Sequence, residues 1–327
     1  MTREAGAFEI VDVTPAHVAA ASYKIALPRG PRDAHEDNIV ATGAGAHVLD
    51  VLLKLTQGSG TVLDIGANLG TIALPLAISG CRVLAFDILE SNIKALELGA
   101  SANNISRRID TYRIAAWSCR SRLAIYNSGS LGLISTVPQS SFADAAPLDR
   151  IVPWYRPIKA VKIDIEGTEL HALQGMRRLL KLWHPHIVFE NYPAGLSSFN
   201  SSTAKVFSFL RSLGYKIFRL RWQVLHPASD VPEQLVTDFL ASTWPEDKLR
   251  STLGYEIRPM LDGEIVAEIL AYSEFHDDHR LYLLSIADLL PESVRNDTQV
   301  QSLIASFSPR LKSDPRIAKY RAGVIAP

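Results

Sequence analysis

The chain has few cysteines, no excess of either charge and no long hydrophobic run, and each shortage excludes a class of protein. Only Cys81 and Cys119 occur in 327 residues, too few for a disulfide framework or for paired cysteine ligands of a metal. The 34 basic residues balance the 34 acidic residues, so the chain has no global field that would attract nucleic acid or anionic lipid. We therefore expect no nucleic-acid partner.

Long apolar segments are also missing. The run TIALPLAISG, residues 71–80, is far too short to span a bilayer. The first residues, MTREAGAFEIVD, lack the basic and then apolar layout of a signal peptide. We expect a cytoplasmic protein without a membrane span, and the sequence leaves its oligomeric state open.

The chain does contain apolar strand and helix patterns that alternate, which is typical of an α/β fold. The patterns from Thr61 predict strand, helix, strand and helix in turn, and the same alternation returns from residue 160 to 220. The polar stretch from Ser128 to about Pro157 is expected to form a loop or small insertion. From about residue 225 the periodicity is helical or mixed, as in VPEQLVTDFLAS. We expect an N-terminal segment (1–43), a central domain (44–224) and a C-terminal extension (225–327) that binds the acceptor or packs on the domain.

The first candidate site is the segment VLDIGANLG, where a buried strand ends at Asp64 and a turn with Gly66 and Gly70 opens a helix. Ligands of open α/β sheets bind at such carboxyl ends of strands. The spacing Gly-x-x-x-Gly does not meet the dinucleotide fingerprint Gly-x-Gly-x-x-Gly. Asp87 ends the next strand, at about the offset where an acid accepts hydrogen bonds from ribose hydroxyls. The two acids together predict a nucleoside site, which by itself does not separate a sulfonium donor from NAD.

The second candidate site is VKIDIEGTEL, residues 161–170, in which three acids follow an apolar strand. In strand geometry Lys162, Asp164 and Glu166 project to the same side, so we expect Asp164 and Glu166 to converge at the carboxyl end of their strand. Glu169 is expected to favour the start of the next helix.

These segments resemble the FkbM family of S-adenosylmethionine-dependent methyltransferases. The resemblance rests on VLDIGANLG followed by AFD, on VKIDIEGTELHALQGM before PHIVFEN, and on PLDRIVP, and it covers roughly residues 45 to 222. It implies a class I methyltransferase fold, Rossmann-like with three layers and a mostly parallel sheet of seven strands. The sequence departs from the family where Asp87 is followed by Ile88 and Leu89, since the family often has Glu-Pro there.

The resemblance also implies roles for individual residues. S-adenosylmethionine is the implied cofactor, and the residues expected to bind it are Asp64, Gly66, Asn68, Gly70, Asp87, Ala115, Ala116 and Trp117. The carboxylates at the second site are expected to face the methyl group of the donor, where an acid can take the proton of an attacking hydroxyl. The catalytic candidates are Asp164, Glu166, Glu190 and His171. His171 is equally compatible with a place on the helix surface.

We expect no metal, with Mg²⁺ held by Asp164 and Glu190 as the alternative. His276 and His279, which flank two aspartates, are expected to form a solvated turn. The predicted function is O-methyl transfer to a hydroxyl of a sugar or specialised metabolite. The alternatives are a nicotinamide-dependent oxidoreductase and a scaffold that binds S-adenosylmethionine without turnover.

Overall fold

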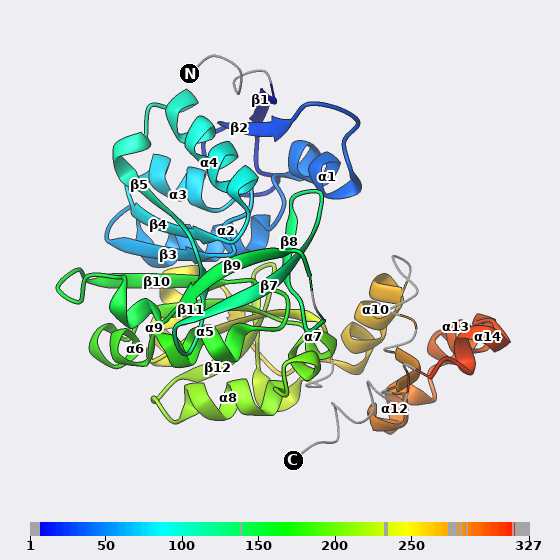
Figure 1. The fold of residues 1–327 in the computed structure, drawn as a ribbon. Helices are drawn as coiled ribbons and strands as arrows, with labels where there is room; N and C mark the ends of the chain where they lie inside the picture. Colours follow the sequence, from blue (N-terminus) through cyan, green and yellow to red (C-terminus); the bar gives the residue numbers. More distant parts are fainter. Residues whose placement is uncertain are drawn as a thin grey trace.

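The computed structural model describes residues 7–137, 139–231, 235–273, 280, 283–285, 287–315 and 317, so His276 and His279 lie outside the described residues. The main element is a sheet of nine strands (Figure 1). Their order across the sheet is β15 (Glu256–Ile257), β13 (Val224–Pro227), β12 (Lys216–Arg221), β14 (Thr237–Ser242), β11 (His186–Asn191), β10 (Ile158–Ile163), β3 (Thr61–Ile65), β4 (Arg82–Asp87) and β5 (Ile109–Arg113).

Within this sheet the seven strands from β12 to β5 form the predicted, mostly parallel unit. β5, β4, β3, β10 and β11 run parallel, and β14 runs antiparallel to both of its neighbours, β11 and β12. The three-layer α/β fold is thereby confirmed. β13 and β15 extend the sheet beyond the predicted seven strands.

Helices cover both faces of the sheet because its strands are apolar on both sides. Val62 and Ala160 belong to one core, whereas their neighbours Leu63 and Val161 belong to the other. Strands buried on both faces are expected where a parallel sheet lies between two helical layers. The first face packs against α2 (Ala46–Thr56), α3 (Ala73–Ser79), α4 (Glu90–Ala102) and α9 (Glu246–Leu253), and the second against α5 (Glu169–Gly175), α6 (Arg177–Trp183) and α8 (Thr203–Arg211).

A second, smaller sheet occupies the stretch that we expected to be a loop. Its order is β6 (Ala115–Ala116), β9 (Ser141–Ala146), β7 (Ser121–Ser128) and β8 (Leu131–Ile134). Ile125 and Ala143 of this sheet pack against Leu89, so the small sheet lies beside the carboxyl end of β4. Outside the small sheet, further short helical elements of the structure are α7 (Pro193–Ser198) and the 3₁₀ turns η1 (Ser106–Arg108), η2 (Leu148–Arg150), η3 (Ala228–Asp230) and η4 (Ala287–Leu289).

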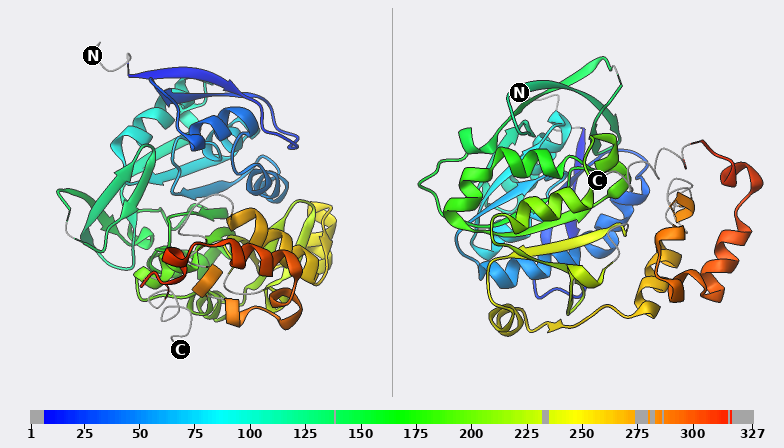
Figure 2. Two further views of the ribbon diagram at one scale, coloured as in Figure 1. Left: turned by 90° about the vertical axis from the view of Figure 1, so that its right-hand side faces the viewer. Right: turned by 90° about the horizontal axis from the view of Figure 1, so that it is seen from below.

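The two ends of the chain form additions to this body. The N-terminal segment contains the hairpin of β1 (Phe8–Val13) and β2 (Tyr23–Pro28) and the helix α1 (Ala34–Thr42), which Asp33 caps. The helices α10 (Asp262–Ser273), α12 (Glu292–Arg295), α13 (Thr298–Ser306) and α14 (Pro309–Lys312) form a group beside the body (Figure 2). The boundary predicted at residue 224 is not where the sheet ends, because β14 inserts between β11 and β12.

Two local differences from the sequence prediction have clear causes. The first predicted helix, residues 68–79, starts only at Ala73, which places Pro75 in its first turn, where proline is tolerated. The strand VKIDI ends at Ile163 rather than at Ile165, because Glu166 and Gly167 both have positive φ and turn the chain.

Candidate functional site

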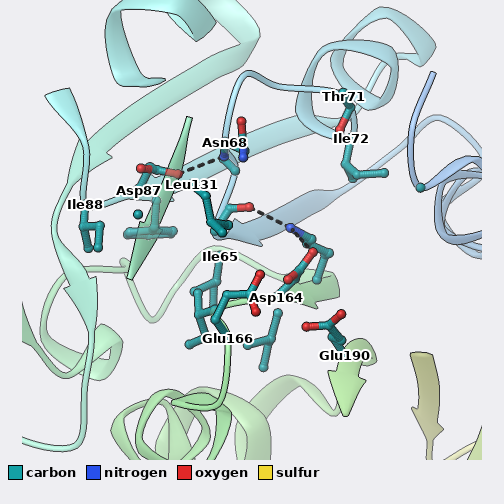
Figure 3. Close-up of a pocket in the computed structure, with 18 of the residues that line it drawn as sticks. Ile65, Asn68, Thr71, Ile72, Asp87, Ile88, Leu131, Asp164, Glu166 and Glu190 are labelled. Carbon is teal, nitrogen blue, oxygen red and sulfur yellow. Dashed lines mark hydrogen bonds and ion pairs between the residues drawn. The ribbon is translucent and has the colours of Figure 1, made fainter. Parts of the chain in front are cut away.

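A cavity of about 640 Å³ lies at the carboxyl ends of β3, β4, β10 and β11. Residues at and after these strand ends line it, and so do the N-terminal parts of α1 and α2, residues 114–116, β8 with the turn before it, and Asp238. Figure 3 shows Asn68 and Asp87 at one end of the cavity and the carboxylates of Asp164, Glu166 and Glu190 at the other. Ligands of open α/β sheets bind at this edge.

Asp87 is held by donors that fix both of its oxygens. Oδ1 accepts hydrogen bonds from the backbone N–H of Leu89 at 2.8 Å and from Nδ2 of Asn92 at 3.2 Å, and Oδ2 accepts from the N–H of Asn68 at 2.9 Å. Burial raises the pKa of Asp87, and the bonds from Leu89 and Asn68 oppose that rise. Asn92 also donates to the carbonyl oxygen of Ser130 at 2.8 Å, which ties the turn before β8 to this acid. Since a carboxylate offers about four acceptor positions, Asp87 retains one on Oδ2.

Asp64 lies on β3 and is fully buried, and it does not line the cavity. Neither of its oxygens accepts a hydrogen bond from the described residues. The ammonium of Lys162 lies 3.6 Å from Oδ1 of Asp64 and 3.5 Å from Oδ2 of Asp164. Burial raises the pKa of Asp64 to about 6, and Lys162 opposes this rise. Asp64 thus supports the cavity from behind its wall.

The glycines of the first motif serve backbone packing. Gly66 has a φ of +78°, and a Cβ there would collide with the carbonyl oxygen of Asp164. Gly70 has a φ of +100°, and a Cβ there would lie 2.5 Å from Cδ1 of Leu96. Gly66 and Asn68 line the cavity, whereas Gly70 does not. The close approach that Gly66 permits is therefore between two segments of the protein itself.

Three carboxylates from two strand ends meet at the other end of the cavity. Oxygen atoms of Asp164, Glu166 and Glu190 all lie within 4.8 Å of one another. Burial, the largest cause, and the charge of Asp164 raise the pKa of Glu166 to about 7. Burial and the neighbouring acids, Asp164 first among them, also raise the pKa of Glu190. The predicted convergence of Asp164 and Glu166 holds, although a turn at Glu166, with a φ of +58°, produces it instead of strand alternation.

Glu169 stabilises the turn that presents Glu166. It is fully buried, and its Oε1 accepts hydrogen bonds from the N–H groups of Gly167 at 3.0 Å and Ile165 at 3.4 Å. Burial raises the pKa of Glu169 to about 7.

Two predicted residues lie away from the cavity wall. Trp117 stacks on His171, with ring centroids 3.9 Å apart, and Nδ1 of His171 lies 3.2 Å from Oγ of Ser118. Neither ring lines the cavity, whereas Ala115 and Ala116 do. The structure therefore does not bring His171 to the carboxylates, nor Trp117 to the nucleoside end.

Asp238, which no sequence motif indicated, lines the cavity from β14. Its register partner on β11 is Glu190, and its Oδ2 lies 2.7 Å from Nε2 of His47 on α2. Among the described residues, Asp238 is the last in the chain that lines the cavity. Its segment was interpreted as helical or mixed, so no local signal indicated a strand end there.

Comparison with protein families identifies the class. Residues 64–217 match the model of the methyltransferase FkbM domain, so the predicted resemblance to the FkbM family is confirmed. The matched domain is that of an S-adenosylmethionine-dependent methyltransferase, which confirms the predicted enzyme class and cofactor. No curated protein matches the sequence.

Solved structures similar to the chain include the methyltransferase FkbM from Methylobacillus flagellatus KT, at 21% identity and a TM-score of 0.41, with 56% of this chain and 44% of that chain covered. An rRNA methylase from Streptococcus thermophilus is 14% identical with a TM-score of 0.38, and 60% and 92% of the two chains are covered. An O-methyltransferase from Bacillus cereus in complex with S-adenosylhomocysteine is 16% identical with a TM-score of 0.35, and 65% and 91% are covered. The match thus spans less than half of the Methylobacillus chain.

The expected exclusion of nucleic acid is wrong, because an rRNA methylase is among the structures similar to this chain. The exclusion rested on the zero net charge, which describes the whole chain and does not determine the charge around one cavity.

The prediction of no membrane span concerns the helices of the chain. Among the described helices none is by itself long and apolar enough to cross a membrane, while α1 and α2, bent by 49°, meet the criteria of length and composition together.

Proposed function

We propose that the protein transfers the methyl group of S-adenosylmethionine to a hydroxyl of a sugar or specialised metabolite. The observation that carries this proposal is one cavity with a nucleoside-type acid, Asp87, at one end and the carboxylates of Asp164, Glu166 and Glu190 at the other. A hydroxyl acceptor must lose a proton, and a carboxylate beside it can accept that proton.

The residues at the first end fit the cofactor. Asp87 has one acceptor position left on Oδ2, which suits a ribose hydroxyl, and its other positions are filled by fixed donors. Gly66, Asn68, Ala115 and Ala116 would surround the rest of the cofactor in the cavity. When bound, S-adenosylmethionine supplies a methyl carbon activated by a sulfonium sulfur.

Asp164 is the residue that we assign as the base. Its side chain is 45% exposed, so an acceptor in the cavity can reach it, and its Oδ2 lies 3.5 Å from the ammonium of Lys162. Glu166 and Glu190 hold the hydroxyl beside it. Since methyl transfer requires in-line alignment of the attacking oxygen and the methyl carbon, the main task of these side chains is to orient the acceptor.

Calorimetric titration with S-adenosylmethionine tests the donor site first, and no binding at millimolar concentration would contradict the proposal. The acceptor is sought with a labelled methyl donor and a panel of sugars, specialised metabolites and RNA, read by mass spectrometry. Methylation of RNA alone would replace the proposed acceptor. Donor binding without methylation of any acceptor would favour the scaffold alternative.

Asp164→Asn tests the assignment of the base. We expect turnover to fall by about 100-fold while donor affinity changes by less than about threefold, because the side chain acts on the acceptor. Asp144→Asn, on the exposed side of β9 and outside the cavity, is the matched control and should leave both quantities unchanged. An equal loss of donor affinity in Asp164→Asn would make Asp164 a cofactor ligand.

The cytoplasmic location of the protein remains a prediction.

A further inference from the structure

The carboxylates at the acceptor end are arranged as ligands around one point. Asp164 and Glu166 follow β10, Glu190 belongs to β11, and Figure 3 shows their carboxylates turned toward one another. All pairs of their ligand oxygens lie within 4.8 Å. Three oxygens that are each about 2.4 Å from one cation lie up to about 4.2 Å apart, so small rotations of the side chains bring all three to one ion without a change of fold.

Glu190 adds a second observation, which concerns the burial of one of its oxygens. Its Oε2 is buried and has no hydrogen-bond partner among the described residues, although the side chain lines the cavity. A buried carboxylate oxygen without a partner is costly and therefore rare. The backbone beside it is held in the sheet, because Phe189 pairs with both β10 and β14 and Glu190 pairs with Asp238 of β14.

Lys162 does not supply the missing positive charge. Its ammonium is 3.5 Å from Asp164, but it already donates to the carbonyl oxygen of Gly66 at 2.7 Å and lies 3.6 Å from the buried carboxylate of Asp64. Glu190 also faces Asp238 across the two paired strands. The acceptor end therefore holds more carboxylates than the one ammonium can compensate.

The backbone of Glu166 supports the same interpretation. Glu166 has a φ of +58°, a conformation that a residue with a side chain rarely adopts and that is concentrated at functional sites. Glu169 holds this turn through the N–H of Gly167. The strained turn directs the third carboxylate toward the other two.

We propose that Asp164, Glu166 and Glu190 each give one carboxylate oxygen to a hard divalent cation, Mg²⁺, Mn²⁺ or Ca²⁺, whose open positions take water and the acceptor hydroxyl, while the second oxygen of Asp164 stays available as the base. Carboxylate oxygens are the ligands that these ions prefer. The role of the ion toward the acceptor rests on the proposed function, whereas binding of the ion does not.

The test is a titration of the full chain, freed of metal by chelation and desalting, with Mn²⁺ followed by electron paramagnetic resonance. Calorimetric titrations with Mg²⁺ and Ca²⁺ accompany it. We expect saturable binding of Mn²⁺ at a single site and a rise in melting temperature on addition of the ion. Glu190→Gln removes a ligand and should weaken Mn²⁺ binding by at least about tenfold. Glu166→Gln should have the same effect, and it serves as the second variant if Glu190→Gln does not fold.

Asp238→Asn is the matched control, because it removes the same charge from the same cavity without removing a proposed ligand. It should change the affinity for Mn²⁺ by less than about threefold, as expected for an effect of charge alone. Absence of binding by all three ions at about 5 mM, or equal affinity in wild type and both glutamine variants, would overturn the proposed site. Titration with S-adenosylmethionine in the same preparation separates the two proposals, because donor binding without ion binding contradicts only the ion.

Discussion

The ammonium of Lys162 donates a hydrogen bond to the carbonyl oxygen of Gly66 over 2.7 Å, which joins the end of β10 to the turn after β3. The same ammonium lies between the carboxylates of Asp64 and Asp164. One buried lysine thus connects the two sequence motifs on which the functional interpretation depends. It also compensates Asp64, whose oxygens have no hydrogen-bond partner among the described residues.

Replacement of this lysine should therefore affect the fold and the donor site together. Lys162→Met leaves Asp64 as a buried acid without a compensating cation, and breaking a buried ion pair from one side costs about 3–5 kcal/mol of unfolding free energy. We expect a loss of that order in urea denaturation, and weaker binding of S-adenosylmethionine because the Gly66 turn loses its hydrogen bond.

The matched control is Lys216→Met on β12. Lys216 pairs with Glu246 at 3.3 Å, but its side chain is 56% exposed, so its loss should cost at most about 1 kcal/mol. Similar losses in both variants would show that the buried position of Lys162 has no special importance.

The sequence predicted the positions of the strand ends around Asp64 and Asp87 because their signals are local. Asp64 lies on β3 and Asp87 ends β4, as expected from the end of each apolar run, and these two strands are neighbours in the sheet. The glycine turn between β3 and α3 also follows from adjacent residues. Such features need no knowledge of long-range pairing.

The acceptor end was predicted only in part because it depends on pairing and register between distant segments. Asp238 reaches the cavity through the antiparallel pairing of β14 with β11. Its strand, TDFLAS, is a short run mostly buried on both faces, and periodicity alone does not separate such a run from a buried helix. Trp117 was assigned by resemblance and His171 from its place one turn into the helix, and neither signal showed that the two rings stack on each other.

His186 should make the stability of the protein fall in mild acid. It is buried at the start of β11, with Nδ1 2.9 Å from Oγ of Ser242 and its ring against Trp244, and Lys248 and Lys159 are the charged groups near it. Burial, the largest cause, and these two lysines lower its pKa from 6.5 to about 4. Between these values the unfolded chain binds a proton that the folded chain does not, so unfolding becomes easier as pH falls.

The expected size of this effect is about 2 kcal/mol of unfolding free energy between pH 7.5 and pH 5. Chemical denaturation at both pH values measures it in the wild type and in His186→Gln, which can hydrogen-bond to Ser242 but does not titrate. The variant should lack this part of the decline, while other titrating groups contribute equally to both proteins. Identical pH profiles would show that His186 is not the group responsible.

Gly66 allows the most specific test of how the two motifs fit together. In Gly66→Ala the new Cβ collides with the carbonyl oxygen of Asp164, and that segment cannot move away freely because the N–H of Asp164 donates to the carbonyl oxygen of Ile65 at 3.1 Å. Gly254→Ala is the matched control, because Gly254 has a similar φ of +67° but open space around its Cβ position. The control should lose about 1–2 kcal/mol of unfolding free energy from the positive φ alone.

Gly66→Ala should lose clearly more unfolding free energy in urea denaturation than the control does. It should also bind S-adenosylmethionine more weakly, since its turn lines the cavity. Equal losses in the two variants would mean that the contact between the motifs yields easily, and that the donor and acceptor ends of the cavity are positioned independently of each other.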